Sequence, residues 1–206
     1  MAVPLKDRDR PGPGRPRAFP HWGFGSLSRR ARALALGVGL LSCGALPGQT
    51  LAASAQEYQV KAAFLYNFAK FVDWPGEPAG TGAPLVITVF GKDPFGPALE
   101  NIVLGRTVNG RPLVIRRTSR LEELLPCHIL FISSSEKRRL AEILQALKSA
   151  SVLTVSDMEE FLRLGGTVRF FVEENKVRFG INLEAARRTE LKISSKLLSL
   201  ARLDRN

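Results

Sequence analysis

The stretch "HILFISSSEKRRLAEILQALKSASVLTVS", residues 128–156, decides the fold class of this chain. Its first residues, HILFIS, and its last apolar run, SVLTV, both have the length and the β-branched composition of buried strands. The 16 residues between 134 and 149 have the length and apolar spacing of a helix. A strand, a helix and a strand in this order favour a right-handed crossover between parallel strands. The stretch therefore predicts an α/β domain.

The same alternation continues on both sides of this stretch. Two more short apolar runs with strand composition precede it, at 85–90 and 111–117. Further helices are expected at 91–103, where Asp93 would act as the cap before Pro94, at 119–125 behind Ser119, and at 156–164, ended by Gly165 and Gly166. This spacing predicts a mostly parallel sheet with helices on both faces.

The C-terminal part breaks the alternation. Residues 166–183 contain two strand-like runs around Glu174 and Asn175, which predicts an antiparallel hairpin. Residues 190–203 then predict a closing amphipathic helix, with Leu191, Ser195, Leu198 and Ala201 near one stripe.

The segment before the first strand, Glu57 to Trp74, predicts a helix with a broad aromatic face, which we expect to pack against the sheet. It is not a membrane span, because Lys61, Asn67, Lys70 and Asp73 interrupt it. Lys61 does not fit the apolar face, and we interpret it as a side chain that extends its ammonium group to water.

Residues 1–55 predict an N-terminal leader and a secretory signal peptide, followed by a single domain over 56–206. Arg29, Arg30 and Arg32 precede an apolar run, and small residues precede the expected cleavage site before Gln56. An alternative remains open, because Leu40 to Cys43 resembles a lipobox, in which Cys43 would carry a lipid anchor. The long segment before Arg29 is either part of the signal or lies upstream of the true start. All of these alternatives place the protein in the periplasm.

Export changes the charge of the protein. The leader holds eight of the 30 basic and two of the 19 acidic residues, so the net charge falls from +11 to +5. The aromatic residues lie on apolar faces rather than among the arginines, and together with the compartment this argues against a nucleic-acid partner.

The expected mature chain also offers little for catalysis. It keeps one cysteine, Cys127, and one histidine, His128, so neither an internal disulfide nor a Cys/His zinc site can form. Adjacent residues on a strand point to opposite faces, which separates a nucleophile from its base. No phosphate-binding, dinucleotide or nucleophile-elbow motif occurs. We therefore expect a protein that is not an enzyme and that carries no cofactor and no metal.

Small ligands of parallel sheets bind outside the carboxyl ends of the strands. Three such ends lead into expected helix N-termini, and the candidate ligand-binding residues there are Gly91, Lys92 and Asp93; Ser133, Ser134 and Ser135; and Ser156 and Asp157. The alternative interpretation is that these residues only cap helices.

An ordered set of motifs resembles the YfiR-like family of exported bacterial domains. The motifs are YQVKAAFLYNFAKFVDWP, VFGKDPFG, CHILFIS, LTVSDMEEF, the Gly-Gly pair, VRFGINL and LKISSKLLSLAR. The resemblance implies a periplasmic α/β domain that is often dimeric. It also implies repression of a membrane-bound diguanylate cyclase through contact with its periplasmic sensor domain. This chain departs from the best-known member in lacking the cysteines for a disulfide.

We therefore expect an exported regulator that lowers cyclic di-GMP, with a small-molecule sensor for another membrane receptor, such as a histidine kinase, as the alternative. Contact with the membrane would come only through the partner or an anchor at Cys43. The expected partner-binding residues are Phe170, Phe171, Arg178 and Phe179. Strand alternation is expected to place Phe171 and Phe179 on a different face from Phe170 and Arg178, so that one set is exposed.

Overall fold

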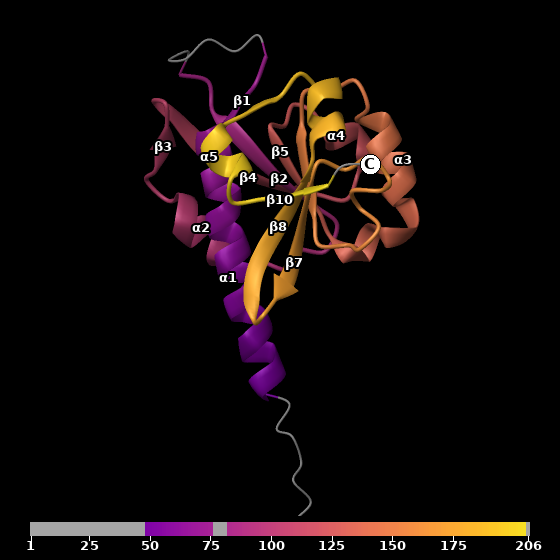
Figure 1. The fold of residues 1–206 in the computed structure, drawn as a ribbon. Helices are drawn as coiled ribbons and strands as arrows, with labels where there is room; N and C mark the ends of the chain where they lie inside the picture. Colours follow the sequence, from indigo (N-terminus) through magenta and orange to yellow (C-terminus); the bar gives the residue numbers. More distant parts are fainter. Residues whose placement is uncertain (1–47, 76–81, 205–206) are drawn as a thin grey trace, which may run out of the picture. The chain divides into compact units, whose positions relative to one another are not determined.

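The computed structural model describes residues 48–75 and 82–204. The proposed lipobox and most of the leader lie outside these residues. The described strands form an eight-stranded sheet in the order β10-β8-β7-β6-β5-β2-β4-β3, and β1 pairs separately with β9 (Figure 1). The strands are β1 Val72–Asp73, β2 Leu85–Phe90, β3 Thr107–Val108, β4 Arg111–Thr118, β5 Ile129–Ile132, β6 Leu153–Ser156, β7 Val168–Glu173, β8 Lys176–Asn182, β9 Lys192–Ile193 and β10 Arg202–Asp204.

The central strands β4, β2, β5, β6 and β7 are parallel, as expected. Strand β8 runs antiparallel to β7, and its turn residues Glu174 and Asn175 have φ values of 49° and 59°. Two consecutive positive φ values are typical of a type I′ hairpin turn. The predicted mostly parallel α/β fold with a C-terminal antiparallel hairpin is therefore confirmed.

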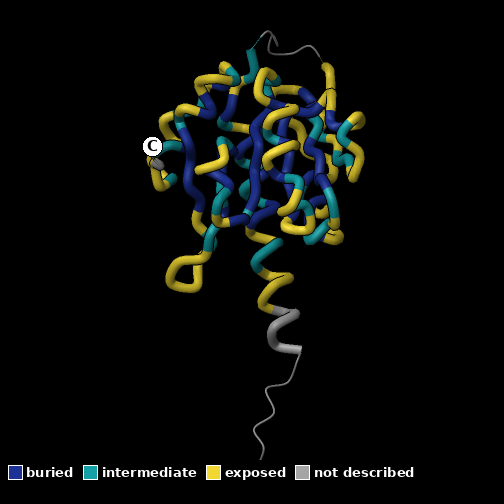
Figure 2. The backbone as a smooth tube through the Cα atoms, turned by 90° about the vertical axis from the view of Figure 1, so that its right-hand side faces the viewer, coloured by how far each residue is buried: buried dark blue, intermediate teal, exposed yellow. Residues whose placement is uncertain are grey.

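The sheet has a separate apolar core on each face. Along β5, Ile129 and Phe131 belong to the core that includes the first helix, α1 (Gly48–Phe71), whereas Leu130 and Ile132 belong to the core that includes α3 (Leu140–Ala146). This division follows from the two-residue period of a strand. The helical segments are α1 Gly48–Phe71, α2 Ala98–Val103, η1 Leu121–Glu123, η2 Ser134–Arg139, α3 Leu140–Ala146, α4 Leu183–Arg188 and α5 Ser195–Leu198. Figure 2 shows the buried backbone in the interior of the domain, with exposed segments around it.

Helix α1 packs its aromatic face on the hairpin. The ring of Phe68 stacks on Phe170 with 5.8 Å between centroids and meets Phe179 edge-on at 5.2 Å. The helix begins before the predicted Glu57 and ends at Phe71. It does not reach Trp74, because Val72 and Asp73 pair with β9 instead.

Several predicted helices are shorter than expected. The segment 91–103 is helical only from Ala98, because the Asp93 carboxylate accepts the N–H of Phe95 at 2.7 Å and holds a turn ahead of the helix. At 119–125 only a 3₁₀ turn forms, and its first residue has no side-chain cap from Ser119. The long helix after β5 is divided into η2 and α3, and Ser133 caps its start as predicted.

The prediction of a helix at residues 156–164 is wrong. These residues form turns, in which Leu164 N–H donates to the carbonyl of Glu160 but no further helical turn follows. Gly165, with φ of 96°, and Gly166 close the segment by donating to the carbonyls of Leu162 and Phe161. This pair of bonds is the Schellman arrangement expected of a glycine stop.

The closing helix is reduced to one turn. Residues 195–198 form α5, but the segments on either side become β9 and β10, which pair with β1 and β8. The helical stripe predicted from Leu191 to Ala201 therefore does not exist. Backbone pairing with existing strands outweighed the amphipathic pattern of the segment.

Candidate functional site

The carboxyl ends of β2 and β5 lie directly against each other, and the loops that follow them interlock. The backbone N–H of Lys92 donates to the Ser135 hydroxyl at 3.0 Å. Gly91 has φ of 88°, and a Cβ at this position would lie 2.5 Å from the Ser135 oxygen. The Gly91–Asp93 turn is therefore a close contact between loops, and no hollow separates it from Ser135.

Asp93 is engaged by the protein itself. One carboxylate oxygen accepts the Phe95 N–H, and the other accepts Nε of Arg117 at 2.6 Å. The same guanidinium forms an ion pair with Glu100 at 2.6 Å. The hydrogen bond from Arg117 lowers the pKa of Glu100 and in turn raises the pKa of Arg117. Asp93 thus anchors the turn to β4.

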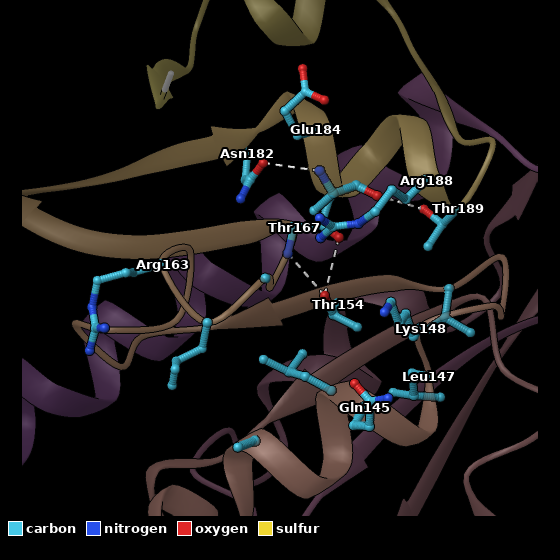
Figure 3. A pocket seen from close by; sticks show the side chains of 16 residues that line it. Gln145, Leu147, Lys148, Thr154, Arg163, Thr167, Asn182, Glu184, Arg188 and Thr189 are labelled. Carbon is cyan, nitrogen blue, oxygen red and sulfur yellow. Dashed lines mark hydrogen bonds between the residues drawn. The ribbon is translucent and has the colours of Figure 1, made fainter. Parts of the chain in front are cut away.

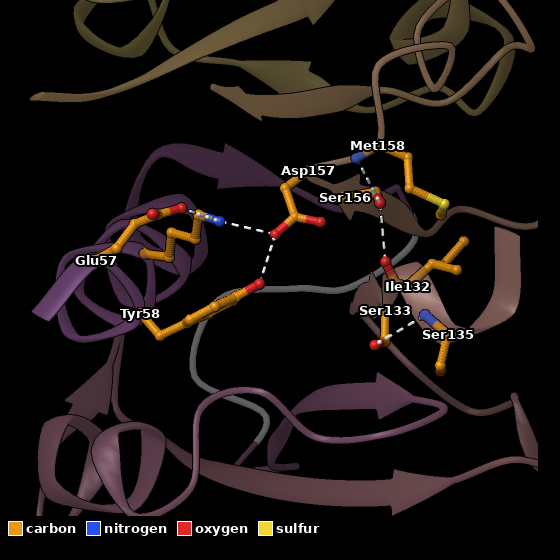
Figure 4. Close-up of polar contacts among 9 residues, drawn as sticks. Glu57, Tyr58, Ile132, Ser133, Ser135, Ser156, Asp157 and Met158 are labelled. Atoms are coloured by element: carbon orange, nitrogen blue, oxygen red, sulfur yellow. Dashed lines mark hydrogen bonds and ion pairs between the residues drawn. The ribbon is translucent and has the colours of Figure 1, made fainter. Parts of the chain in front are cut away.

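The serines at this edge mostly bond to nearby backbone, as the capping interpretation predicts (Figure 4). The Ser133 hydroxyl accepts the N–H of Ser135, and Ser156 donates to the carbonyl of Ile132 at 2.8 Å while accepting the N–H of Met158. Ser134 is exposed. Among them only Ser133 caps a helical segment, and the role of these residues in ligand binding stays a prediction.

Asp157 instead meets α1. Its Oδ2 accepts a hydrogen bond from Tyr58 and one from Lys61, each at 2.7 Å (Figure 4). Lys61 is only 2% exposed, and it also pairs with Glu57 at 2.6 Å, one helical turn earlier. The interpretation of Lys61 as a side chain that reaches water is therefore wrong. The sequence did contain a signal for this buried ion pair, because Lys61 lies within the aromatic face of the helix and follows Glu57 by four residues.

Tyr58 completes this contact. The Lys61 ammonium lies 4.2 Å from the centre of the Tyr58 ring, which adds a cation–π interaction. Burial, and then the hydrogen bond to the Asp157 carboxylate, raise the pKa of Tyr58 well above its ordinary value. The hydroxyl therefore stays protonated and acts as a donor. The arrangement holds α1 against the end of β6 by charge and hydrogen bonding.

Cys127 and His128 are built into the opposite, amino-terminal edge of the sheet. Burial raises the pKa of the Cys127 thiol to about 11, which makes it a poor nucleophile at neutral pH. His128 accepts the N–H of Val86 at Nδ1, and its Nε2 lies 3.1 Å from the Arg111 guanidinium. Across residues 48–75 and 82–204, no group of three or more His, Cys, Asp or Glu side chains is arranged to hold a metal.

The four residues expected to bind a partner divide differently from the prediction. The register pairs Phe170 with Phe179 and Phe171 with Arg178. Phe170 and Phe179 are 1% and 2% exposed and contact α1, so they belong to the core. Phe171 and Arg178 lie on the other face of the hairpin, where Arg178 is exposed. The predicted grouping is therefore wrong, because directly paired residues share a face.

Phe171 lines two hollows at this edge of the sheet. One has a volume of about 150 Å³ and is lined by Leu162, Arg169, Phe171, Gly180, Arg202 and Leu203. The other, of about 260 Å³, lies beside Arg178 and Leu200. The Arg169 guanidinium is 5.4 Å from the centre of the Phe171 ring. An aromatic ring that lines hollows beside arginines is the composition expected of a protein-binding surface.

Within the described part of the chain, none of the helices combines the length and the apolar character that crossing a membrane requires. A family model described as YfiR/HmsC-like matches residues 58–202, which confirms the resemblance found in the sequence. No curated protein matches the chain.

Two solved structures resemble the chain at low identity. One is a conserved domain protein from Vibrio cholerae O1 biovar El Tor, with 9% identity, a TM-score of 0.47, and coverage of 70% of this chain and 60% of that one. The other is the ABC domain in complex with L-Trp from Streptococcus pneumoniae, with 7% identity, a TM-score of 0.48, and coverage of 72% and 60%. The chain thus spans 60% of the length of each of these structures.

Proposed function

Because this chain belongs to the YfiR/HmsC-like family, we propose that it is an exported regulator that binds the periplasmic domain of a membrane-bound diguanylate cyclase and represses it. The family match supports this most strongly, since it runs from α1 into β10 and covers nearly the whole described domain. Repression would lower cyclic di-GMP in the cytoplasm.

Repression of this kind requires differential binding and no chemistry. The regulator must prefer the inactive conformation of its partner, and the shift it produces is limited by that preference. Moving an equilibrium from 99:1 to 1:99 takes about 5.5 kcal/mol. A single interface with a few buried aromatic or arginine side chains supplies energy of this size.

We assign the partner contact to the outer face of the hairpin together with the adjoining C-terminal segment, defined by Arg169, Phe171, Arg178, Leu200 and Arg202. Leu200 is 67% exposed and lines the same hollow as Phe171, so these two large apolar side chains lie next to each other at the surface. Three arginines accompany them, and the nearby Glu173 pairs with Arg202 at 3.7 Å. The surface therefore suits a partner that presents apolar and acidic side chains.

Deleting the gene tests the function. We expect the deletion strain to contain more cyclic di-GMP, to form more matrix and to swim less, and expression of the intact gene to reverse all three. Unchanged cyclic di-GMP, in a strain that expresses a membrane cyclase encoded alongside, would refute the proposal.

Binding experiments test the surface. Phe171→Ala and Arg178→Glu should each weaken binding to the periplasmic region of that cyclase at least tenfold, because they remove the central ring or reverse a charge. Lys192→Glu is the matched control, since Lys192 is also exposed but lies on β9. Equal effects of Arg178→Glu and Lys192→Glu would show that only net charge matters, which would contradict the assigned surface.

A second function is supported by a cavity of about 590 Å³ between α3 and α4. Its volume is within the range of small-molecule sites, which agrees with a sensor that serves another membrane receptor. A histidine kinase or transporter gene next to this one, and no cyclase gene, would favour the sensor.

A further inference from the structure

The cavity lies at the amino-terminal end of β6, away from the strand ends where the sequence predicted a ligand. Helix α3 forms one wall, the turn that ends at Gly165 forms another, and α4 forms the third (Figure 3). Thr154, Thr167 and Asn182 lie at its floor, and all three are at least 95% buried. The cavity is therefore an open hollow with a polar floor inside the domain.

Three basic side chains line the opening: Lys148, Arg163 and Arg188. All three are exposed, and none forms an ion pair with any residue in 48–75 or 82–204. The one carboxylate of the lining, Glu184, pairs with Arg187 at 2.8 Å. The cavity thus has an excess of positive charge that no described carboxylate balances.

Arg188 extends across this opening toward Gly165. A Cβ on Gly165 would lie only 3.3 Å from Nη2 of Arg188, so the glycine leaves room for the guanidinium. Lys148 and Arg163 stand on opposite sides of the cavity in Figure 3. A ligand in the cavity would therefore meet positive charge on more than one side.

The two threonines of the floor leave one donor unused. The hydroxyls of Thr154 and Thr167 lie 3.1 Å apart, so one donates to the other, and Thr154 also accepts the N–H of Thr167. Each hydroxyl carries a single hydrogen, and only one of the two is used between them. No described residue accepts the other hydrogen, although both side chains are buried.

Asn182 leaves a second donor unused. Its Oδ1 accepts the N–H of Ala185 and its Nδ2 donates to the carbonyl of Leu162, which fixes the orientation of the amide. An amide nitrogen carries two hydrogens, so one remains without an acceptor among the described residues. A buried donor without a partner is costly, and both unused donors border the same cavity.

From the two unused donors and the three basic side chains without ion pairs, we propose that the cavity binds an organic anion. The anion would be a carboxylate or a phosphate ester with an apolar body. Arg188, Lys148 and Arg163 would hold the anionic group, since guanidinium and ammonium groups form strong charge-assisted hydrogen bonds with such oxygens. The unused donors of the floor would bond further oxygens of the ligand. Leu144, Leu147, Val152 and Leu164 also line the cavity and would contact its apolar body.

Calorimetric titration with phenyl phosphate tests the site on the protein purified as its host processes it. We expect phenyl phosphate to bind at least tenfold more tightly than benzyl alcohol, which has a similar ring but no charge. Arg188→Gln should weaken phenyl phosphate binding at least tenfold, which is the effect of losing one charge-assisted hydrogen bond. Titration with 3-phenylpropionate then compares the two head groups, and the tighter anion identifies the class.

Arg138→Gln is the matched control, because Arg138 is also an exposed arginine but lies in η2 and does not line the cavity. It should change the affinity less than twofold, and both variants should keep the melting temperature of the parent. Equal affinities of the two variants would overturn the proposal. So would phenyl phosphate binding no more tightly than benzyl alcohol, or no binding at millimolar concentrations. Repression of a cyclase is measured separately and does not depend on these results.

Discussion

The ammonium group of Lys61 lies inside the domain because two carboxylates and an aromatic ring replace the water that it loses. Asp157 and Glu57 approach it at 2.7 and 2.6 Å, and the Tyr58 ring lies beside it. A buried charge with good partners contributes little net stability, but removing one partner leaves the others without compensation. The contact therefore matters chiefly for positioning α1 against the end of β6.

Replacing Lys61 with methionine should destabilise the domain by about 3 kcal/mol, because Asp157 would keep its charge at a side chain only 16% exposed. Urea unfolding measures the difference. Lys70→Met, on the exposed part of the same helix, is the control and should change stability by less than about 0.5 kcal/mol. If both variants unfold alike, Lys61 does not hold α1.

Because the Cys127 thiol ionises less readily in the folded protein than in the unfolded chain, we expect the protein to lose stability at alkaline pH. Its pKa is raised to about 11 in the folded protein, whereas an unfolded thiol titrates near about 8.5. Above the lower value the unfolded chain binds fewer protons than the folded one, so stability falls as pH rises. The contribution of the protonated thiol to the free energy of unfolding is fully present below about pH 8.5. It should decline by roughly 2–3 kcal/mol between that pH and pH 11.

Unfolding measurements from pH 7 to 11, on the parent and on Cys127→Ala, isolate this contribution. The variant lacks the thiol, so its stability should fall less steeply over this range, whatever its stability at pH 7. Parallel pH profiles would show that Cys127 ionises equally in both states.

At the scale of the element, α1 is attached to the sheet mainly through its aromatic rings. Phe68 is fully buried and contacts Phe64, Phe170 and Phe179. Phe68→Ala should therefore cost about 3–5 kcal/mol, from lost burial and from the cavity it leaves. Thermal unfolding checks this, with Val60→Ala as control, because Val60 is 41% exposed on the same helix. A Phe68→Ala protein that melts like the parent but loses partner binding would mean that this face is an interface.

At the scale of the whole molecule, export remains a prediction, and the structure shows the surroundings of the expected cleavage site. Helix α1 continues through the expected cleavage site, but residues 53–56 are exposed, so cleavage before Gln56 would remove no buried side chain from positions 53–55. Mass spectrometry of the protein from its host should therefore find an N-terminus at or near Gln56. An intact leader in the cytoplasm would contradict export, and a diacylated Cys43 would establish the lipoprotein alternative.

The sequence by itself determined the features that depend on local pattern. Short β-branched runs between helices specified the parallel strands, because this alternation is compatible with few chain topologies. Glu174 and Asn175 marked the hairpin and the Gly165–Gly166 pair marked a chain reversal, and of these Asn175 and Gly165 are residue types that readily adopt the positive φ found there. Ser133 was correctly identified as a cap from local pattern, whereas Ser119 caps nothing and no helix follows Ser156.

The tertiary structure decided everything that depends on which distant segments meet. Residues 190–203 have a helical pattern, but neighbouring strands offered backbone partners, and β9 and β10 formed instead. Lys61 is buried because Asp157, 96 residues away, lies beside it, and no local pattern encodes that distance. The cavity between α3 and α4 has the same origin, since its unused donors and unpaired cations come from four separate segments that only the packed sheet brings together.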